Sequence, residues 1–222
     1  MGGWHIKKKT KGDICMNSAL LAEYLDSLER HGIPGCECVI YHNHKRVFHH
    51  LAGYGDAEKS KPLAGDHTFW IYSMSKVITC TAVMQLVEKG SIGLDDPVAD
   101  YLPEYGSLKV KHGSVVKQAQ NPMTIRHLLS MQSGLNYNIE APSIQKVLKD
   151  TNKQATTRQI IKALADEPLD FEPGTHYQYS LSHDVLGAVI EEVTGQRFGE
   201  YLDEHIFKPL GMKNTGFGLT PE

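Results

Sequence analysis

The stretch "WIYSMSKVITCTAVMQLVEKG" (residues 70–90) places a serine and a lysine three positions apart at the head of an apolar run. Apolar side chains after the serine cover most of a helical circumference, which predicts a buried helix over residues 74–88. Gly90 suits the end of this helix, because glycine adopts the left-handed C-cap conformation without steric cost. The helix and its polar head therefore define where the centre of the fold lies.

The serine and lysine, Ser73 and Lys76, allow two interpretations. Residues three apart on a helix share a face, so a helix that begins at Ser73 directs the hydroxyl and the ammonium toward the same space. N–H groups of its first turn would stabilise an oxyanion, and partial burial would lower the pKa of Lys76 toward that of a working base. The alternative is structural, with Ser73 as an N-cap and Lys76 extended to water. The pair alone favours the structural interpretation, because N-cap serines are common.

Ser-x-x-Lys is a weak pattern, and the chain contains it three times: Ser73 with Lys76, Ser114 with Lys117, and Ser143 with Lys146. Only the first occurrence heads an apolar helix that could keep its surroundings dry. Ser114 falls in a polar segment, and Ser143 begins an amphipathic helix of exposed character.

Composition excludes several classes of protein. The chain has 222 residues, 41% of them hydrophobic and 22% charged, with a formal net charge of −3. These values are ordinary for a globular domain, and nothing in them calls for nucleic acid or an anionic membrane surface. We find no apolar stretch of membrane-spanning length and no secretory signal, so we expect a cytoplasmic protein with no membrane span.

The order of predicted elements indicates an α+β fold with an N-terminal helix and hairpin followed by a mainly helical region. Helical periodicity covers residues 18–32, and "CECVIYHNHKRVFHHLAG" (residues 36–53) reads as two strands around a turn at 42–45. "TFWIYS" (residues 68–73) reads as a short extended piece, and residues 107–121 read as an irregular exposed loop. Further helices are expected near residues 124–134, 142–150 and 157–167, and in two segments between residues 183 and 211 that each end at glycine.

Six segments occur in an order that is typical of one family: "GYGDAEKSKPLAGDHTFWIYSMSKVIT", "LDDPVADYLPEY", "MTIRHLLSMQSGL", "FEPGTHYQYS", "DVLGAVIEEVTGQ" and "IFKPLGMKNTGF". Together they resemble the serine beta-lactamase-like family, which includes class C beta-lactamases, penicillin-binding DD-peptidases, D-aminopeptidases and carboxylesterases. The resemblance spans about residues 18–222. It implies an antiparallel sheet flanked by helices together with an all-helical region, and a reactive serine between them.

The resemblance also implies roles for individual residues. Ser73 matches the nucleophile, Lys76 the lysine of the Ser-x-x-Lys motif, and Tyr179 the tyrosine of the family's Tyr-x-Asn motif. In relatives the tyrosine is the candidate base, and the nearby ammonium keeps its phenol acidic. We therefore predict a serine acyl hydrolase that acts through an acyl-enzyme at Ser73. Its predicted substrate is a small-molecule ester, a beta-lactam or a D-amino-acid peptide.

The chain departs from the family pattern in two places. Leu181 stands where the Asn of Tyr-x-Asn is expected, which favours the esterase-like branch. The third motif, Lys/His-Thr/Ser-Gly on a later strand, is not found before Glu222, and "HGS" at 112–114 precedes the second motif. We accordingly expect an N-terminal tail over 1–17 and a beta-lactamase-like domain over 18–222 that lacks its C-terminal strands and helix. The sheet would then be incomplete, and its exposed edge would favour self-association.

No cofactor or metal is predicted. "CEC" sets two cysteines on one face of a strand, but the CxxC spacing of zinc sites is missing. The twelve histidines complete no HExxH set or carboxylate set, so those of the hairpin read as exposed surface residues. The competing functional hypothesis is a catalytically weak or inactive truncated relative, a binding module or a fragment.

Overall fold

The computed structural model describes residues 17–217, so of the tail expected over residues 1–17 it describes only Asn17. The chain divides into two compact units, with the boundary between Trp70 and Ile71. Among the described residues, no helix has the length and apolar character needed to cross a bilayer.

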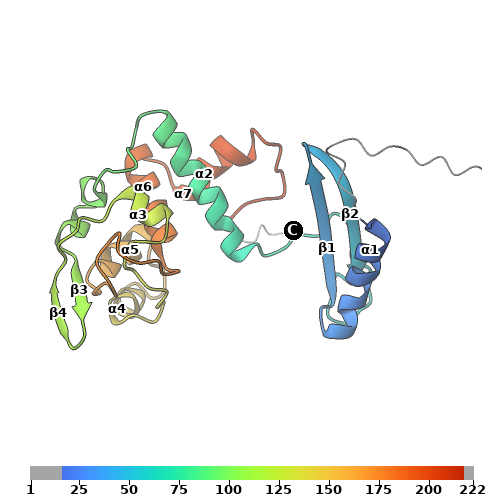
Figure 1. The fold of residues 1–222 in the computed structure, drawn as a ribbon, viewed down its shortest axis with the longest axis horizontal. Helices are drawn as coiled ribbons and strands as arrows, with labels where there is room; N and C mark the ends of the chain where they lie inside the picture. Colours follow the sequence, from blue (N-terminus) through green and yellow to red (C-terminus); the bar gives the residue numbers. More distant parts are fainter. Residues whose placement is uncertain (1–16, 218–222) are drawn as a thin grey trace, which may run out of the picture. The chain divides into compact units, whose positions relative to one another are not determined.

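The first unit consists of a helix and a hairpin (Figure 1). Its elements are α1 (Ser18–Ser27), the 3₁₀ turn η1 (Leu28–His31), β1 (Gly35–His42) and β2 (Lys45–Gly53). The Asn17 side chain caps α1 by accepting a hydrogen bond from the Leu20 N–H at 3.0 Å. The two strands pair antiparallel, and Asn43 and His44 take φ of 49° and 60° in the turn. Two successive positive φ values match the right-handed twist of the strands, which confirms the predicted hairpin.

The second unit is mainly helical and also contains a short hairpin (Figure 1). Its α-helices are α2 (Ser75–Glu88), α3 (Ile125–Leu129), α4 (Pro142–Asp150), α5 (Thr157–Leu164), α6 (Ser182–Thr194) and α7 (Phe198–Leu202). Its 3₁₀ turns are η2 (Tyr72–Met74), η3 (Val98–Asp100) and η4 (Pro103–Ser107), and α7 continues into a π-helical turn, η5 (Asp203–Phe207). Its strands are β3 (Lys109–His112) and β4 (Val115–Gln118).

Helix α6 is the centre of the second unit. It packs against α2, α3, α5 and α7, and every residue from Val185 to Ile190 is buried. Ala82, Val83 and Leu86 of α2 face the same core. Burial on this scale, at about 25 cal/mol per Å² of apolar surface, is the main force that fixes the relative positions of α2 and α6. These two helices carry the candidate site at their N-terminal ends.

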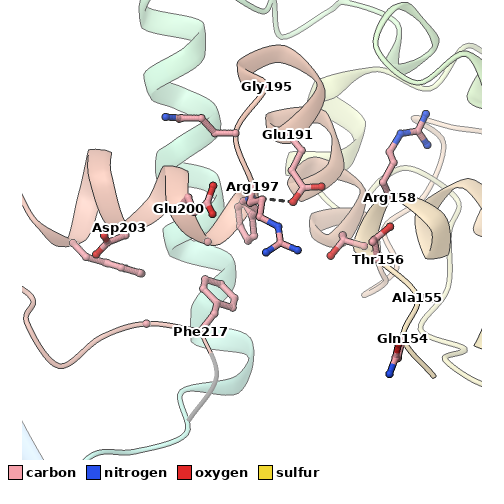
Figure 2. A pocket seen from close by; sticks show the side chains of 16 residues that line it. Gln154, Ala155, Thr156, Arg158, Glu191, Gly195, Arg197, Glu200, Asp203 and Phe217 are labelled. Carbon is pink, nitrogen blue, oxygen red and sulfur yellow. Dashed lines mark hydrogen bonds between the residues drawn. The ribbon is translucent and has the colours of Figure 1, made fainter. Parts of the chain in front are cut away.

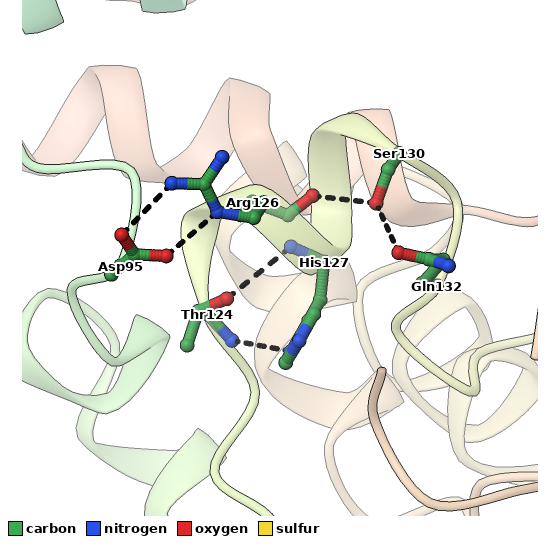
Figure 3. Close-up of polar contacts among 6 residues, drawn as sticks. All are labelled: Asp95, Thr124, Arg126, His127, Ser130 and Gln132. Carbon is green, nitrogen blue, oxygen red and sulfur yellow. Dashed lines mark hydrogen bonds and ion pairs between the residues drawn. The ribbon is translucent and has the colours of Figure 1, made fainter. Parts of the chain in front are cut away.

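Side-chain hydrogen bonds stabilise the start of α3 (Figure 3). Thr124 and His127 form a capping box, in which the Thr124 hydroxyl accepts from the His127 N–H and the His127 ring bonds the Thr124 N–H. Arg126 donates two hydrogen bonds to Asp95, at 2.7 and 2.8 Å. His127 therefore has a structural role at the start of this helix.

Two predictions about local structure are wrong. Residues 107–121 contain the β3–β4 hairpin rather than an irregular loop, because Val110 is fully buried and bridges to Leu169, 59 positions away. Residues 68–71 form no strand, and the chain turns at Tyr72 with φ of 41°. Both differences come from tertiary contacts that local sequence patterns do not encode.

Candidate active site

Ser73 lies just before α2 rather than at its first helical position. It belongs to the 3₁₀ turn η2, and the α-helix begins at Ser75, one residue after the start of the helix expected over residues 74–88. Tyr72, the preceding residue, takes a positive φ that is unusual for a non-glycine residue. Such backbone strain concentrates at functional sites, and here it occurs next to the predicted nucleophile.

The three residues predicted for catalysis lie together. Ser73 Oγ and the Tyr179 hydroxyl share a short hydrogen bond, and Lys76 Nζ donates to Ser73 Oγ at 3.4 Å. Lys76 Nζ also lies 4.8 Å from the centroid of the Tyr179 ring. A hydroxyl, an ammonium and a phenol therefore converge from two elements that are more than 100 positions apart in the sequence.

The electrostatics of the cluster differ from the sequence-based expectation. Burial alone would lower the pKa of Lys76, but its interactions with the Tyr179 phenol and with neighbouring acidic groups outweigh burial and raise the pKa. The interactions with Lys76, and secondly with Ser73, lower the pKa of Tyr179 below the ordinary value for a phenol. Lys76 is therefore the charged partner at neutral pH, and Tyr179 is the group that more readily loses a proton.

The other two Ser-x-x-Lys pairs form no comparable cluster. Ser114 is exposed in the turn between β3 and β4. The Ser143 hydroxyl is buried without a hydrogen-bond partner, while Lys146 points to Asp150 at 3.3 Å. Within residues 17–217, only the pair at the head of α2 has its serine and lysine side chains hydrogen-bonded to each other, with a third polar side chain bonded to the same serine hydroxyl.

A cavity of about 330 Å³ opens beside Ser73. It is lined by Tyr72, Ser73, Ser75, Lys76, Thr79, Tyr137, Thr157, His183, Asp184, Gly187, Phe198 and Phe217. The cavity has the size of a small-ligand site and combines aromatic walls with a few polar groups. Ser73 itself is exposed and Lys76 is half-buried. Within the part of the chain that the structure describes, the site is therefore not shielded from water, contrary to the prediction.

Sequence reasoning missed three residues of this site. The Tyr137 ring stacks on Tyr179 with the centroids 5.2 Å apart, and Lys76 Nζ lies 5.4 Å from the Tyr137 centroid. His183 and Asp184 enter the cavity from the first turn of α6. The helical period of α6 could have suggested that His183 is buried, but no local pattern connects Tyr137 to a residue 42 positions later.

His183 and Asp184 have shifted pKa values for the same first reason, partial burial. Burial lowers the pKa of His183, whose Nε2 lies 3.5 Å from Cys80 Sγ and whose Nδ1 has no partner within the described residues. Burial raises the pKa of Asp184, although its side chain still reaches solvent, and the positive charge of Lys76 opposes that rise. Asp184 thus adds negative charge near the Lys76 ammonium.

Leu181, which stands in place of the expected Asn, is only 7% exposed and belongs to the apolar core. Its side chain has no polar atom with which to hold a substrate amide. Position 181 therefore places no amide group in the cavity, and cleavage of a substrate amide that must be held by this position is disfavoured.

A second and larger pocket, of about 970 Å³, lies along α5, α6 and α7 (Figure 2). It shares Thr157, Phe198 and Phe217 with the cavity beside Ser73, but it contains neither Ser73 nor Lys76. Arg197 and Glu191 project into it, and Glu191 accepts a hydrogen bond from the Phe198 N–H at 2.9 Å. Without a serine and base pair, this pocket is not the centre of the chemistry.

Comparison with known proteins gives one consistent result. The family model described as Beta-lactamase matches residues 18–222. Esterase EstB of Burkholderia gladioli is 33% identical over 213 residues, a match that covers 91% of this chain and 53% of the esterase. The putative penicillin-binding protein PbpX of Bacillus subtilis is 31% identical, with 77% of this chain and 38% of that protein covered.

The solved structures agree with the sequence comparisons. EstCE1, a hydrolase with promiscuous acyltransferase activity, superposes with a TM-score of 0.79 at 32% identity, covering 91% of this chain and 54% of that chain. The α+β, beta-lactamase/transpeptidase-like fold expected from the sequence is thereby confirmed. The chain spans about half the length of EstB and of EstCE1, and a smaller part of PbpX.

Proposed function

Because the chain belongs to the beta-lactamase family, we propose that it is a serine hydrolase that cleaves acyl compounds through an acyl-enzyme at Ser73. The observation that carries this proposal is the position of Ser73 Oγ within hydrogen-bonding distance of both the Tyr179 hydroxyl and Lys76 Nζ. A serine becomes a useful nucleophile when an adjacent group accepts its proton and a second group controls the charge of that base.

The pKa directions of Lys76 and Tyr179 support the following order of steps. Tyr179, as phenolate, accepts the Ser73 proton while Ser73 Oγ attacks the carbonyl carbon, and the carbonyl oxygen becomes an oxyanion. Collapse expels the alcohol or amine, which takes the proton from Tyr179 and leaves the acyl group on Ser73. Water then attacks the acyl-enzyme with Tyr179 again as base, releasing the acid and the free serine. Lys76 remains an ammonium throughout and stabilises the phenolate.

We expect esters to be better substrates than amides or lactams. Leu181 is packed in the core and supplies no amide contact, and proteins described as esterases are among the similar relatives. The third motif of the family, which would add an oxyanion donor, is not present in the 222 residues. Since one such donor is worth about 3–4 kcal/mol in the transition state, we expect acylation to be detectable and turnover to be slow.

The test is hydrolysis of p-nitrophenyl butyrate by the 222-residue chain. Ser73→Ala should reduce the rate to the uncatalysed background, and Ser114→Ala, which removes the serine of another Ser-x-x-Lys pair, should leave it unchanged. Hydrolysis of the chromogenic cephalosporin nitrocefin should be slower than that of the ester. Retained activity in Ser73→Ala would exclude the acyl-enzyme proposal, and faster cleavage of nitrocefin would exclude the ester preference.

A non-catalytic binding module is the alternative that the same experiment addresses. Ser73 is exposed to solvent, so water competes with a substrate for the space beside its hydroxyl. This exposure favours the binding module. A wild-type chain that folds but shows no Ser73-dependent hydrolysis, together with ester binding measured by calorimetry, would support the binding module instead.

A further inference from the structure

We propose that the ring of Tyr137 is a positioning element of the site, which holds the Lys76 ammonium beside Ser73 through a cation–π contact that it shares with the ring of Tyr179. This inference rests on the proposed function and deepens it, because it concerns how the ammonium reaches its working position. It assigns the role to the aromatic face of Tyr137 and not to its hydroxyl.

The geometry supports two simultaneous cation–π contacts. Lys76 Nζ lies 4.8 Å from the Tyr179 centroid and 5.4 Å from the Tyr137 centroid, both within the range of about 6 Å for this interaction. The two rings lie 5.2 Å apart with an interplanar angle of 25°. The ammonium thus contacts a pair of stacked rings, one of which carries the proposed base.

No carboxylate fixes the ammonium in place. Among the described residues, Lys76 makes no ion pair within 4.0 Å; its Nζ donates to Ser73 Oγ at 3.4 Å and interacts with the Tyr179 hydroxyl. Asp184 lines the same cavity and acts on Lys76 only as a nearby charge. The flexible lysine side chain therefore depends on the two rings and on Ser73 for its orientation.

The backbone holds the two rings in register. The Leu181 N–H donates to the Asn136 carbonyl at 3.1 Å, and the Gln178 N–H donates to the Met131 carbonyl at 2.9 Å. These bonds join the segment that carries Tyr137 to the segment that carries Tyr179. The backbone therefore places the two tyrosines next to each other.

The Tyr137 hydroxyl has no hydrogen-bond partner in the described part of the chain, whereas the Tyr179 hydroxyl bonds Ser73. The Tyr137 phenol also acts on Lys76 through its charge and raises the pKa of the ammonium. The direct contact of Lys76 Nζ is with the ring, however, so the positioning role is assigned to the π face. Phenylalanine would preserve that face, and leucine would preserve only an apolar side chain.

The test compares Tyr137→Leu with the conservative variant Tyr137→Phe by two readouts. The first is the rate at which a fluorophosphonate labels Ser73. The second is the titration of the Tyr179 phenol, followed by NMR of protein labelled with carbon-13 at tyrosine Cζ and assigned with Tyr179→Phe. Tyr177→Leu, which changes an exposed tyrosine two residues before Tyr179, is the matched control.

We expect Tyr137→Leu to slow labelling by roughly 2- to 30-fold, the range that one cation–π contact spans. The same change should move the Tyr179 titration to higher pH, because a displaced ammonium stabilises the phenolate less. Tyr137→Phe should restore both the wild-type rate and the wild-type titration, and Tyr177→Leu should alter neither.

Two results would overturn the inference: Tyr137→Phe behaving like Tyr137→Leu, or Tyr137→Leu behaving like the wild type. A wild-type chain that takes no label at Ser73 would instead overturn the proposed function. In that case the phenol titration still decides the role of Tyr137, because it needs no turnover.

Discussion

Residues 17–70 and residues 71–217 differ sharply in how completely they bury their apolar side chains. In the first unit only Leu25 and Ala52 are buried hydrophobic residues, while Val39 and Tyr41 of β1 are 43% and 63% exposed. In the second unit, Val185 and Leu186 of α6 are fully buried at 0% exposure. A site that needs fixed geometry belongs on the packed unit, and there Ser73, Lys76 and Tyr179 lie together.

The same comparison makes the first unit a less suitable place for a site that needs fixed geometry. A two-stranded hairpin with one helix provides few buried contacts, so it opens locally at low free energy. Its ion pairs, such as that of Lys59 with Glu29 at 2.7 Å, lie in solvent-accessible positions and contribute little. The contrast between the units can be tested by matched substitutions, one in each unit.

The largest expected difference between the two units is the effect of removing a tyrosine hydroxyl on the labelling of Ser73. Tyr179→Phe keeps the ring and its stacking but removes the proposed base, so the rate of Ser73 labelling by fluorophosphonate should fall by about 10²- to 10⁴-fold. Tyr41→Phe removes a similarly exposed phenol from the first unit and should leave the rate unchanged. Labelling kinetics followed by in-gel fluorescence measure both. Equal effects of the two changes would remove the distinction between the units.

The next difference concerns stability. Leu186→Ala creates a cavity at the centre of the second unit, and the free energy of unfolding should fall by about 2–5 kcal/mol. Val47→Ala shortens a side chain that is 45% exposed on β2, and should change stability by less than about 0.5 kcal/mol. Urea denaturation followed by circular dichroism measures the two values. A larger loss in Val47→Ala than in Leu186→Ala would reverse the order that burial predicts.

The smallest expected effect concerns ion pairs. Arg158 makes two hydrogen bonds to Glu104, whose side chain is 17% exposed. Because solvent reaches the guanidinium and screens the pair, Arg158→Ala should cost only about 1 kcal/mol at pH 7. Lys59→Ala, which breaks a more exposed pair with Glu29 in the first unit, should have no measurable effect.

The pH dependence of the Arg158 effect checks its origin. Burial acts to raise the pKa of Glu104, but the hydrogen bonds from Arg158 outweigh it and leave the pKa lowered. The stabilisation is therefore present above the unfolded pKa of about 4.3 and is lost as the pH falls through the lower folded value. The cost of Arg158→Ala should shrink in unfolding measurements near pH 3, and a cost that is independent of pH would show that packing and not charge is responsible.

Much of the fold could be predicted from the sequence, because the patterns involved are local. The turn at Asn43 and His44 follows from alternation in the strands, and Gly90, with φ of 71°, ends the segment after α2 as expected of a C-cap glycine. The resemblance brought Ser73, Lys76 and Tyr179 into one site before any geometry was known. Their catalytic roles remain proposals.

The rest depends on contacts between distant segments. The turn at Tyr72 needs a backbone conformation that is set by packing. The bridge from Val110 to Leu169 and the stacking of Tyr137 on Tyr179 join residues that no local period connects. The pKa of Lys76 was predicted in the wrong direction for the same reason. Burial can be inferred from the helix pattern, but whether the neighbouring phenols and Asp184 outweigh it depends on distances that the sequence does not contain.

The central claim is that Ser73 is the nucleophile of a site contained in the second unit. The most direct measurement is peptide mapping by tandem mass spectrometry after the 222-residue chain reacts with a fluorophosphonate. We predict one covalent adduct, on the peptide that contains Ser73, and none in Ser73→Ala. An adduct on Ser114 or Ser143, an adduct that persists in Ser73→Ala, or a folded wild-type chain that takes no adduct would contradict the claim.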